Sequence, residues 1–322
     1  MSYFAVTVTY GDRFKYLKQV IDSLLEQKID KILIVSNGSN ENSLNKTKEL
    51  VRKTNNIELI DLKSNTGSAN GFYQGIKYAY DKGAEYIWLL DDDNKPTKNS
   101  LKILKEERVN LINKYTNESL ALLSYRNDRK IYSDAIDLIN PRLMLGVNNS
   151  FLGFSLFNNI ESLFKTKKPK VVTQKDRGIV AVAPYGGLFF HRDLISKIGF
   201  PDISYFLYGD DYDFTYRITK TGGKIFLIKK SKIIDLEKSF HLIKNKRFNT
   251  RYFNTDSKER IFYSVRNGIV FEQNFVSNKS IYLINASFYL LTVLLILFFY
   301  PKQLWKFKYI VKGVHSAIKK AQ

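Results

Sequence analysis

The segment Glu85–Pro96, EYIWLLDDDNKP, constrains the fold more than any other stretch of this chain. Residues 86–90 form an unbroken apolar run, which predicts a buried β-strand. Three adjacent carboxylates, Asp91, Asp92 and Asp93, follow at once, and they repel one another unless a cation lies nearby. A divalent metal with oxygen ligands, itself carrying a substrate's phosphates, is one such cation. The alternative interpretation is a solvated acidic turn.

Strand and helix patterns alternate along the first 91 residues. The β-rich runs at 4–10, 31–35 and 57–62 are each followed by a helical pattern, at 13–27, about 42–54 and 69–82. This alternation predicts an α/β fold, with a parallel sheet covered by helices on both faces. Ligands bind such sheets at the carboxyl ends of the strands. Those ends are polar here: Thr9-Tyr10, Ser36-Asn37, Asn65–Gly67 and Asp91–Asp93.

No dinucleotide-binding or P-loop glycine pattern follows the first strand, so we expect metal and side chains to hold any phosphates. A second acidic cluster lies in YGDDYDFTYR at 208–217, where Asp210 or Asp211 starts a predicted helix. A carboxylate at a helix N-terminus is stabilised as the anion, the form that a general base needs. A capping residue on a solvated face is the alternative. Two acidic clusters in one α/β chain favour metal binding at one and proton abstraction at the other.

The net charge of +20 is concentrated in residues 220–322, which carry +15. This predicts an anionic partner, namely membrane lipid, nucleic acid or a phosphorylated acceptor. The chain has no cysteine, which excludes disulfides and thiolate metal sites. Residues 281–300 have no charge and are just long enough to span a bilayer. Because lysines follow them, we favour a helix lying in the cytoplasmic leaflet, with a core helix or a dimer interface as alternatives.

Several motifs, in this order, resemble a known family. They are VTVTY at 6–10, NTG at 65–67, WLLDDD at 88–93, GG at 186–187, YGDDYDFTYR at 208–217, then His241 and YSVRN at 263–267. Together they resemble bacterial inverting glycosyltransferases of family 2, which have the GT-A fold. The resemblance covers roughly residues 3–270. It is greatest to the galactofuranosyl- and rhamnosyltransferases of surface polysaccharide synthesis, and the acidic pattern at 210–213 favours the galactofuranosyl type.

The resemblance implies roles for individual residues. Mn²⁺ or Mg²⁺ would be held by Asp91, Asp93 and His241, and Asp211 would be the catalytic base. Asp91 would also lie against the nucleotide sugar, whose other predicted contacts are Thr9, Asn37, Asn65 and Asp92. The predicted donor and acceptor pocket comprises Trp88, Tyr185, Gly186, Gly187 and Asp210.

The resemblance also implies an organisation and partners. We expect a GT-A catalytic domain at 1–255, with an insertion at about 125–178, and a helical membrane-associating region at 256–322. The expected donor is UDP-galactofuranose, and the expected acceptor is a glycan or polyprenyl-diphosphate-linked sugar, such as lipid-linked O-antigen or capsule, at the cytoplasmic face of the membrane. Alternatives are a dTDP-rhamnose-dependent rhamnosyltransferase, a nucleotidyltransferase, and a basic nucleic-acid- or membrane-binding protein without catalysis.

Overall fold

The structure is a computed structural model that describes residues 1–164, 175–237 and 251–321. Its contacts group the chain into two units, which are described separately. Unit 1 comprises the described residues of Met1–Met144, Val171–Phe206 and Asp210–Glu237, and unit 2 those of Leu145–Lys170, Leu207–Gly209 and Lys238–Gln322. Unit 2 thus takes in part of the expected insertion, while the division expected after residue 255 stays a prediction.

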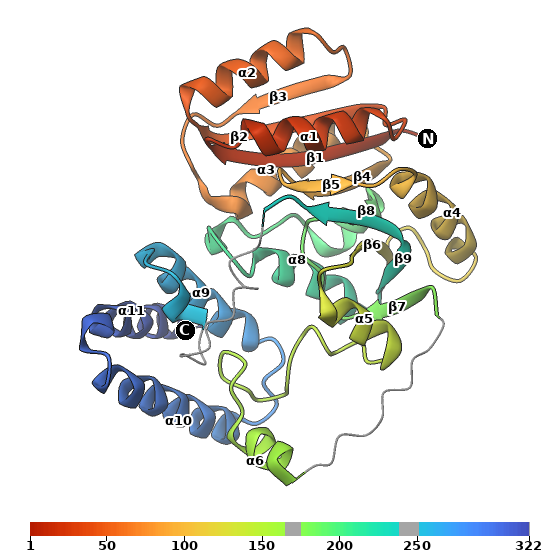
Figure 1. Ribbon diagram of the computed structural model, residues 1–322. Helices are drawn as coiled ribbons and strands as arrows, with labels where there is room; N and C mark the ends of the chain where they lie inside the picture. The colour runs from red at the N-terminus through yellow and green to blue at the C-terminus, as the bar shows by residue number, and fades with distance from the viewer. Residues whose placement is uncertain (165–174, 238–250, 322) are drawn as a thin grey trace. The chain divides into compact units, whose positions relative to one another are not determined.

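Unit 1 is an α/β structure whose strands and helices alternate along the chain (Figure 1). Its strands are β1 (Tyr3–Gly11), β2 (Lys31–Ser39), β3 (Ile57–Asp61), β4 (Tyr86–Asp91), β5 (Asn94–Pro96), β6 (Leu120–Arg126), β7 (Arg177–Val180), β8 (Leu188–His191) and β9 (Lys224–Asp235). Its helices are α1 (Phe14–Leu25), α2 (Glu41–Arg52), α3 (Gly67–Asp81), α4 (Ser100–Ile112), α5 (Lys130–Asp137), α7 (Asp193–Ile198) and α8 (Asp210–Lys220), with a short 3₁₀ turn, η1 (Ile203–Tyr205).

The strands form one sheet in the order β3-β2-β1-β4-β8-β6-β9-β5, with β7 pairing β9. The pairs β3–β2, β2–β1 and β1–β4 are parallel, as the alternation predicts. Beyond β4 the sheet is mixed, because β8 runs antiparallel to both β4 and β6. The strand–helix alternation that predicts parallel pairing ends at Asp91 and does not extend to this half. The chain re-enters the sheet at β8 in the opposite direction, just after Gly186-Gly187.

Helices cover both faces of the sheet. Leu17 of α1 and Leu101 of α4 share one core with Trp88 of β4. On the opposite face α3 packs closely through two glycines, since a Cβ on Gly71 or Gly75 would lie within 2.7 Å of a β1 valine. A strand buried on both faces favours a continuous apolar run, as in residues 86–90 of β4.

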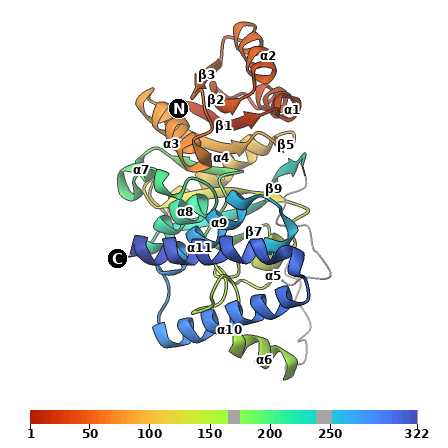
Figure 2. The same ribbon diagram turned by 90° about the vertical axis from the view of Figure 1, so that its left-hand side faces the viewer.

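Unit 2 is helical in the part that the structure describes. Its elements are α6 (Leu156–Phe164), η3 (Arg251–Asn254), α9 (Lys258–Glu272), α10 (Lys279–Phe298), η4 (Pro301–Gln303) and α11 (Leu304–Ala321). Figure 2 shows α10 running beside α11, and the two share a core with α9 around Ile261, Val265 and Ile310. Among the described residues, α10 is the one helix whose length and composition would allow it to cross a membrane.

Candidate active site

The three carboxylates after β4 have different surroundings. Asp92 is buried and accepts a hydrogen bond of 2.7 Å from the Thr9 hydroxyl. The Arg13 guanidinium donates to both of its oxygens, with Nε–O distances of 2.9 Å, and Nη2 lies 2.9 Å from Oδ1. A bidentate arginine is the counter-charge that a buried carboxylate requires. Asp92 is therefore neutralised within the protein itself.

Asp91 and Asp93 are less completely paired. The side chain of Asp91 is 42% exposed, and its Oδ2 faces Arg126 Nη2 at 3.8 Å. Asp93 Oδ1 accepts from Asn94 Nδ2 at 3.2 Å, and its Oδ2 lies 3.5 Å from Arg13 Nη2. These two carboxylates keep oxygens at distances that are long for a charge-assisted hydrogen bond. They are the members of the tripeptide best placed to receive another cation.

Arg126, the last residue of β6, contacts residues of three other segments at this edge of the sheet. Its Nη2 donates to Asn94 Oδ1 and to the Gly186 carbonyl, each at 2.9 Å, and its Nη1 lies 3.4 Å from buried Asp235. A Cβ on Gly186 would come within 2.7 Å of Asp91, Asn94 and Arg126 side-chain atoms. Gly186 is thus required because polar side chains of the site approach its backbone.

The second acidic cluster begins helix α8. Asp211 Oδ1 accepts the backbone N–H of Tyr212 at 2.8 Å. Asp210 is buried, and the Ser68 hydroxyl lies 3.2 and 3.3 Å from its two oxygens. Burial and the charge of Asp211 raise the pKa of Asp210 well above its ordinary value. Burial and the nearby charge therefore favour the protonated form of Asp210.

The remaining carboxyl groups have raised pKa values. Partial burial, together with the charges of Asp92 and Asp211, raises the pKa of Asp91 to about 6. Burial and the charge of Asp91 raise the pKa of Asp93 to about 7. Burial raises the pKa of Asp211 to about 6, whereas the Tyr212 N–H and the Arg126 guanidinium lower it. Thr215 of α8 bonds the backbone N–H and carbonyl of Ala183, each at 2.9 Å, and Gly186, three residues further on, lies against Asp91, so the two acidic clusters lie near each other at this edge of the sheet.

The donor set at this edge fits a hard divalent cation. Asp91 and Asp93 offer carboxylate oxygens, the ligands that Mg²⁺ and Mn²⁺ prefer, and their mutual repulsion would be relieved by binding one. Within residues 1–164, 175–237 and 251–321, no three histidine or acidic side chains are grouped so as to hold a metal by themselves. His241, the third predicted ligand, lies outside the described residues.

The predicted nucleotide contacts Asn37 of β2 and Asn65 of the loop between β3 and α3 lie next to each other. Asn37 accepts from the Thr66 N–H at 2.8 Å and donates to the Gly67 carbonyl at 2.9 Å. Asn65 Oδ1 accepts from the Gly67 N–H at 2.9 Å and lies 3.5 Å from Asn37 Nδ2. Both side chains therefore brace the turn that begins α3. Their contact with a nucleotide stays a prediction, as does that of Thr9, which bonds Asp92.

Two residues of the predicted pocket are buried. Trp88 is 0% exposed and packs in the core of unit 1, so its part in the donor and acceptor pocket stays a prediction. A β-strand covered on both faces buries every side chain, and this is the physical reason for the burial of Trp88. Tyr185 packs against Phe72 and Phe214, with ring centroids 4.2 and 5.9 Å away. Its buried hydroxyl has no hydrogen-bond partner among the described residues.

Comparison with known proteins identifies this arrangement. Residues 4–110 match the family model described as Glycosyl transferase family 2. Over these residues the chain is similar to family 2 glycosyltransferases. It is similar to the galactofuranosyltransferase GlfT1 of Mycolicibacterium smegmatis, with 25% identity over 68% of this chain and 65% of the relative. It is also similar to the dTDP-rhamnosyl transferase RfbF of Shigella flexneri, with 34% identity over 29% of each chain.

Solved structures agree on the fold. A crystal structure of GalNAc-T7 with UDP, GalNAc and Mn²⁺ has a TM-score of 0.55 and 14% identity, over 84% of this chain and 48% of that one. Residues 1–349 of S. aureus TarS in complex with UDP-GlcNAc have a TM-score of 0.51 and 15% identity, over 89% and 72%. The predicted GT-A fold is confirmed. The chain spans about half of GalNAc-T7 and slightly less than two thirds of GlfT1.

The candidate site also includes residues that the sequence analysis did not single out. Arg13, Asn94, Arg126 and Asp235 all contact the acidic tripeptide or each other. A usable signal exists for two of them, because Arg126 and Asp235 end β6 and β9 and the carboxyl ends of strands form the ligand edge. These two strands are only weakly marked in the sequence, which hides the signal.

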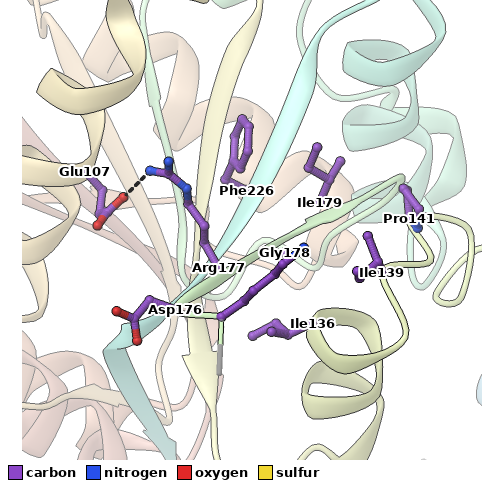
Figure 3. A pocket seen from close by; sticks show the side chains of 10 residues that line it. Glu107, Ile136, Ile139, Pro141, Asp176, Arg177, Gly178, Ile179 and Phe226 are labelled. Carbon is purple, nitrogen blue, oxygen red and sulfur yellow. Dashed lines mark hydrogen bonds and ion pairs between the residues drawn. The ribbon is translucent and has the colours of Figure 1, made fainter. Parts of the chain in front are cut away.

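A cavity of about 600 Å³ lies elsewhere in unit 1 (Figure 3). Its apolar lining includes Ile136, Ile179 and Phe226, and no predicted site residue contributes to it. At its rim Arg177 pairs with Glu107 at 2.9 Å. Because this arginine is already paired, it offers little attraction for a diphosphate. The acidic edge with Asp91 and Asp211 is therefore the better candidate for an active site.

Proposed function

We propose that this protein is an inverting glycosyltransferase with Asp211 as its general base. The acceptor hydroxyl oxygen forms a bond to the anomeric carbon while the bond from that carbon to the diphosphate oxygen breaks. Asp211 takes the hydroxyl proton, and the nucleoside diphosphate leaves with the bonding electron pair. Attack from the face opposite the leaving group inverts the configuration.

The observation that carries this proposal is the meeting of the two acidic clusters at one sheet edge. Asp211 ionises with a pKa of about 6, so it is mostly a carboxylate at neutral pH yet basic enough to accept a proton. The charge of Asp211 contributes to the raised pKa of Asp91, whose side chain is 42% exposed. A base and an accessible metal-type carboxylate in one place are what a transfer from a nucleoside diphosphate requires.

Asp91 and Asp93 would hold Mn²⁺ or Mg²⁺, with His241 proposed as a third ligand. Such a cation, when bound, neutralises negative charge on a departing diphosphate. The likeness to GalNAc-T7, solved with UDP and Mn²⁺, supports this part of the proposal. Arg13 keeps Asp92 out of the metal set by neutralising it, and leaves Asp91 and Asp93 as the oxygen donors.

The donor we propose is UDP-galactofuranose. The relative GlfT1, named as a galactofuranosyltransferase, covers more of this chain than RfbF does, and the TarS structure holds UDP-GlcNAc. Thr9, Asn37, Asn65 and Asp92 lie at or next to the strand ends that would face the nucleotide. The acceptor we propose is a polyprenyl-diphosphate-linked glycan, as in O-antigen or capsule synthesis. The RfbF likeness favours dTDP-rhamnose as the second candidate donor.

Thermal unfolding with nucleoside diphosphates tests the donor assignment. The purified protein is heated with Mn²⁺ and UDP, dTDP, GDP or ADP, and again with EDTA in place of the metal. A ligand at 100 times its dissociation constant adds about 2.7 kcal/mol, which is a readable shift. A Mn²⁺-dependent shift with UDP alone supports the proposal, and a shift with dTDP alone replaces it by the rhamnosyl alternative. If no nucleoside diphosphate raises the unfolding temperature of the protein, the catalytic proposal is wrong, and RNA binding is measured next.

We further propose that α10 attaches the protein to the cytoplasmic membrane surface by lying along it. Large apolar side chains are exposed on one side of the helix, with Leu283, Leu291, Leu295 and Phe298 each more than half exposed. The other side is anchored in unit 2, because Asn285 bonds the Asn149 carbonyl at 2.7 Å. A spanning helix would carry these anchored groups into hydrocarbon, whereas an in-plane helix buries the apolar side alone.

Vesicle co-sedimentation tests this attachment. We expect the protein to bind vesicles containing phosphatidylglycerol, and to bind phosphatidylcholine vesicles less, because lysines of α11 such as Lys308 and Lys312 are exposed. The double variant Leu295→Glu/Phe298→Glu should stay in solution. Val109→Glu, which changes an exposed apolar residue of α4, is the matched control and should bind normally. Unchanged binding by the double variant would show that α10 is not the attachment site.

A further inference from the structure

The backbone just before the proposed base is strained. Phe206 and Tyr208 have φ angles of 63° and 67°, in the left-handed region that bulky residues avoid, and Gly209 follows with φ 80°. Each such non-glycine residue costs on the order of 1–3 kcal/mol and persists only where its surroundings enforce it. Asp210 and Asp211 come next and open α8. A conformation of this kind directly before the general base calls for a group that holds it.

Asn267 of α9 supplies that group. It is 1% exposed, and its Nδ2 donates to the Leu207 carbonyl at 2.7 Å and to the Tyr208 carbonyl at 2.8 Å. Its Oδ1 accepts from Arg266 Nε at 2.7 Å, which fixes the orientation of the amide. The side chain thus donates hydrogen bonds to two successive peptide groups within the strained stretch. This also gives a role to the YSVRN motif at 263–267, which the proposed function leaves unused.

We propose that Asn267 is a positioning residue for the Asp211 base. Two hydrogen bonds to the carbonyls of residues 207 and 208 fix the peptide planes through which the chain enters α8. The first turn of that helix, and with it the direction of the Asp211 carboxylate, follows from where those planes lie. Displacing a reacting group by about 1 Å costs roughly a hundredfold in rate. This inference rests on the proposed function of Asp211.

Steady-state kinetics of Asn267 variants test the inference. Asn267→Ala removes both donated bonds, and we expect kcat to fall about 10- to 100-fold. The donor KM and the affinity for UDP with Mn²⁺ should stay within about twofold of wild type, because the residues proposed to bind the donor are untouched. Asn267→Ser keeps one hydroxyl donor and should give an intermediate kcat. If the alanine variant does not fold, the kcat of the serine variant is compared with that of wild type instead.

Ser264→Ala is the matched control. Ser264 lies one turn earlier on α9 and is also buried, but its hydroxyl has no hydrogen-bond partner in the described part of the chain. We expect wild-type kcat from it. The Asn267 inference is overturned if a folded Asn267→Ala keeps wild-type kcat, or if it loses UDP affinity in proportion to kcat. Asp211→Asn, assayed alongside, separates the two claims: its full activity would instead refute the proposed base.

Discussion

At the scale of single residues, adjacency in sequence does not decide function. Asp91, Asp92 and Asp93 are chemically identical neighbours. Only the carboxylate of Asp92 accepts hydrogen bonds from both Arg13 and Thr9. Burial raises the pKa of all three, but only the outer two are incompletely paired. The sequence could predict that these carboxylates need a cation, because repulsion follows from their spacing. It could not predict which one a protein arginine neutralises, since Arg13 reaches Asp92 only through the pairing of β1 with β4.

The pKa of Asp93 gives a prediction for stability. In the metal-free protein its folded pKa is about 7, against an ordinary value of 3.8. The folded state therefore binds more protons than the unfolded state between these values, and stability falls as pH rises through that window. In Asp93→Asn this contribution is absent. We expect the free energy of unfolding of the variant, relative to wild type, to increase from about pH 4.5 to about pH 7.5.

Urea unfolding in EDTA at several pH values measures this difference. Mn²⁺ should remove the wild-type decline, because a cation stabilises the ionised carboxylates and competes with protons for them. Parallel stability curves for Asp93→Asn and wild type would show that Asp93 ionises as an ordinary aspartate.

At the scale of secondary structure, the first half of the sheet could be predicted and the second half could not. The strands β1 to β4 are rich in β-forming residues and are separated by helices, a pattern that specifies parallel neighbours. In contrast, β5, β7 and β8 have only three or four residues each. Their pairing is set by segments far away in the chain, as when β5 pairs with the end of β9. Local periodicity carries no information about such partners.

The turn that starts α3 yields a prediction at this scale. Gly67 has φ 85°, and a Cβ there would lie 2.1 Å from the Phe206 carbonyl oxygen. Gly67→Ala should therefore destabilise the protein by about 2–4 kcal/mol, through backbone strain and steric overlap together. Gly83→Ala is the matched control, because Gly83 has φ 79° and open space around it.

The control should lose only about 1–2 kcal/mol, which is the cost of a left-handed alanine. Urea unfolding of the two variants compares them directly. Equal losses of stability would mean that the close approach to Phe206 contributes nothing.

At the scale of the whole molecule, the candidate site is built from segments that are remote in sequence. Residues near positions 13, 91, 126, 186, 211 and 235 contribute to it, and all belong to unit 1. The acidic members could be predicted because carboxylates in clusters are conspicuous. Arg13, Arg126 and Asp235 could not, since a single charged residue at a strand end resembles any surface charge until the sheet order is known. Of all these residues, Asp211 has the role on which the proposed chemistry depends most.

Sugar transfer by Asp211→Asn, beside its donor affinity, tests that role most directly. Asparagine has nearly the same shape but cannot take the acceptor proton, so we expect kcat to fall by a factor of about 10² to 10⁴. Because Asp211 is not proposed to bind the nucleotide, the affinity for UDP with Mn²⁺ should change by less than about threefold. Near-normal turnover by a folded Asp211→Asn would contradict the proposed mechanism, because another group would then have to take the proton.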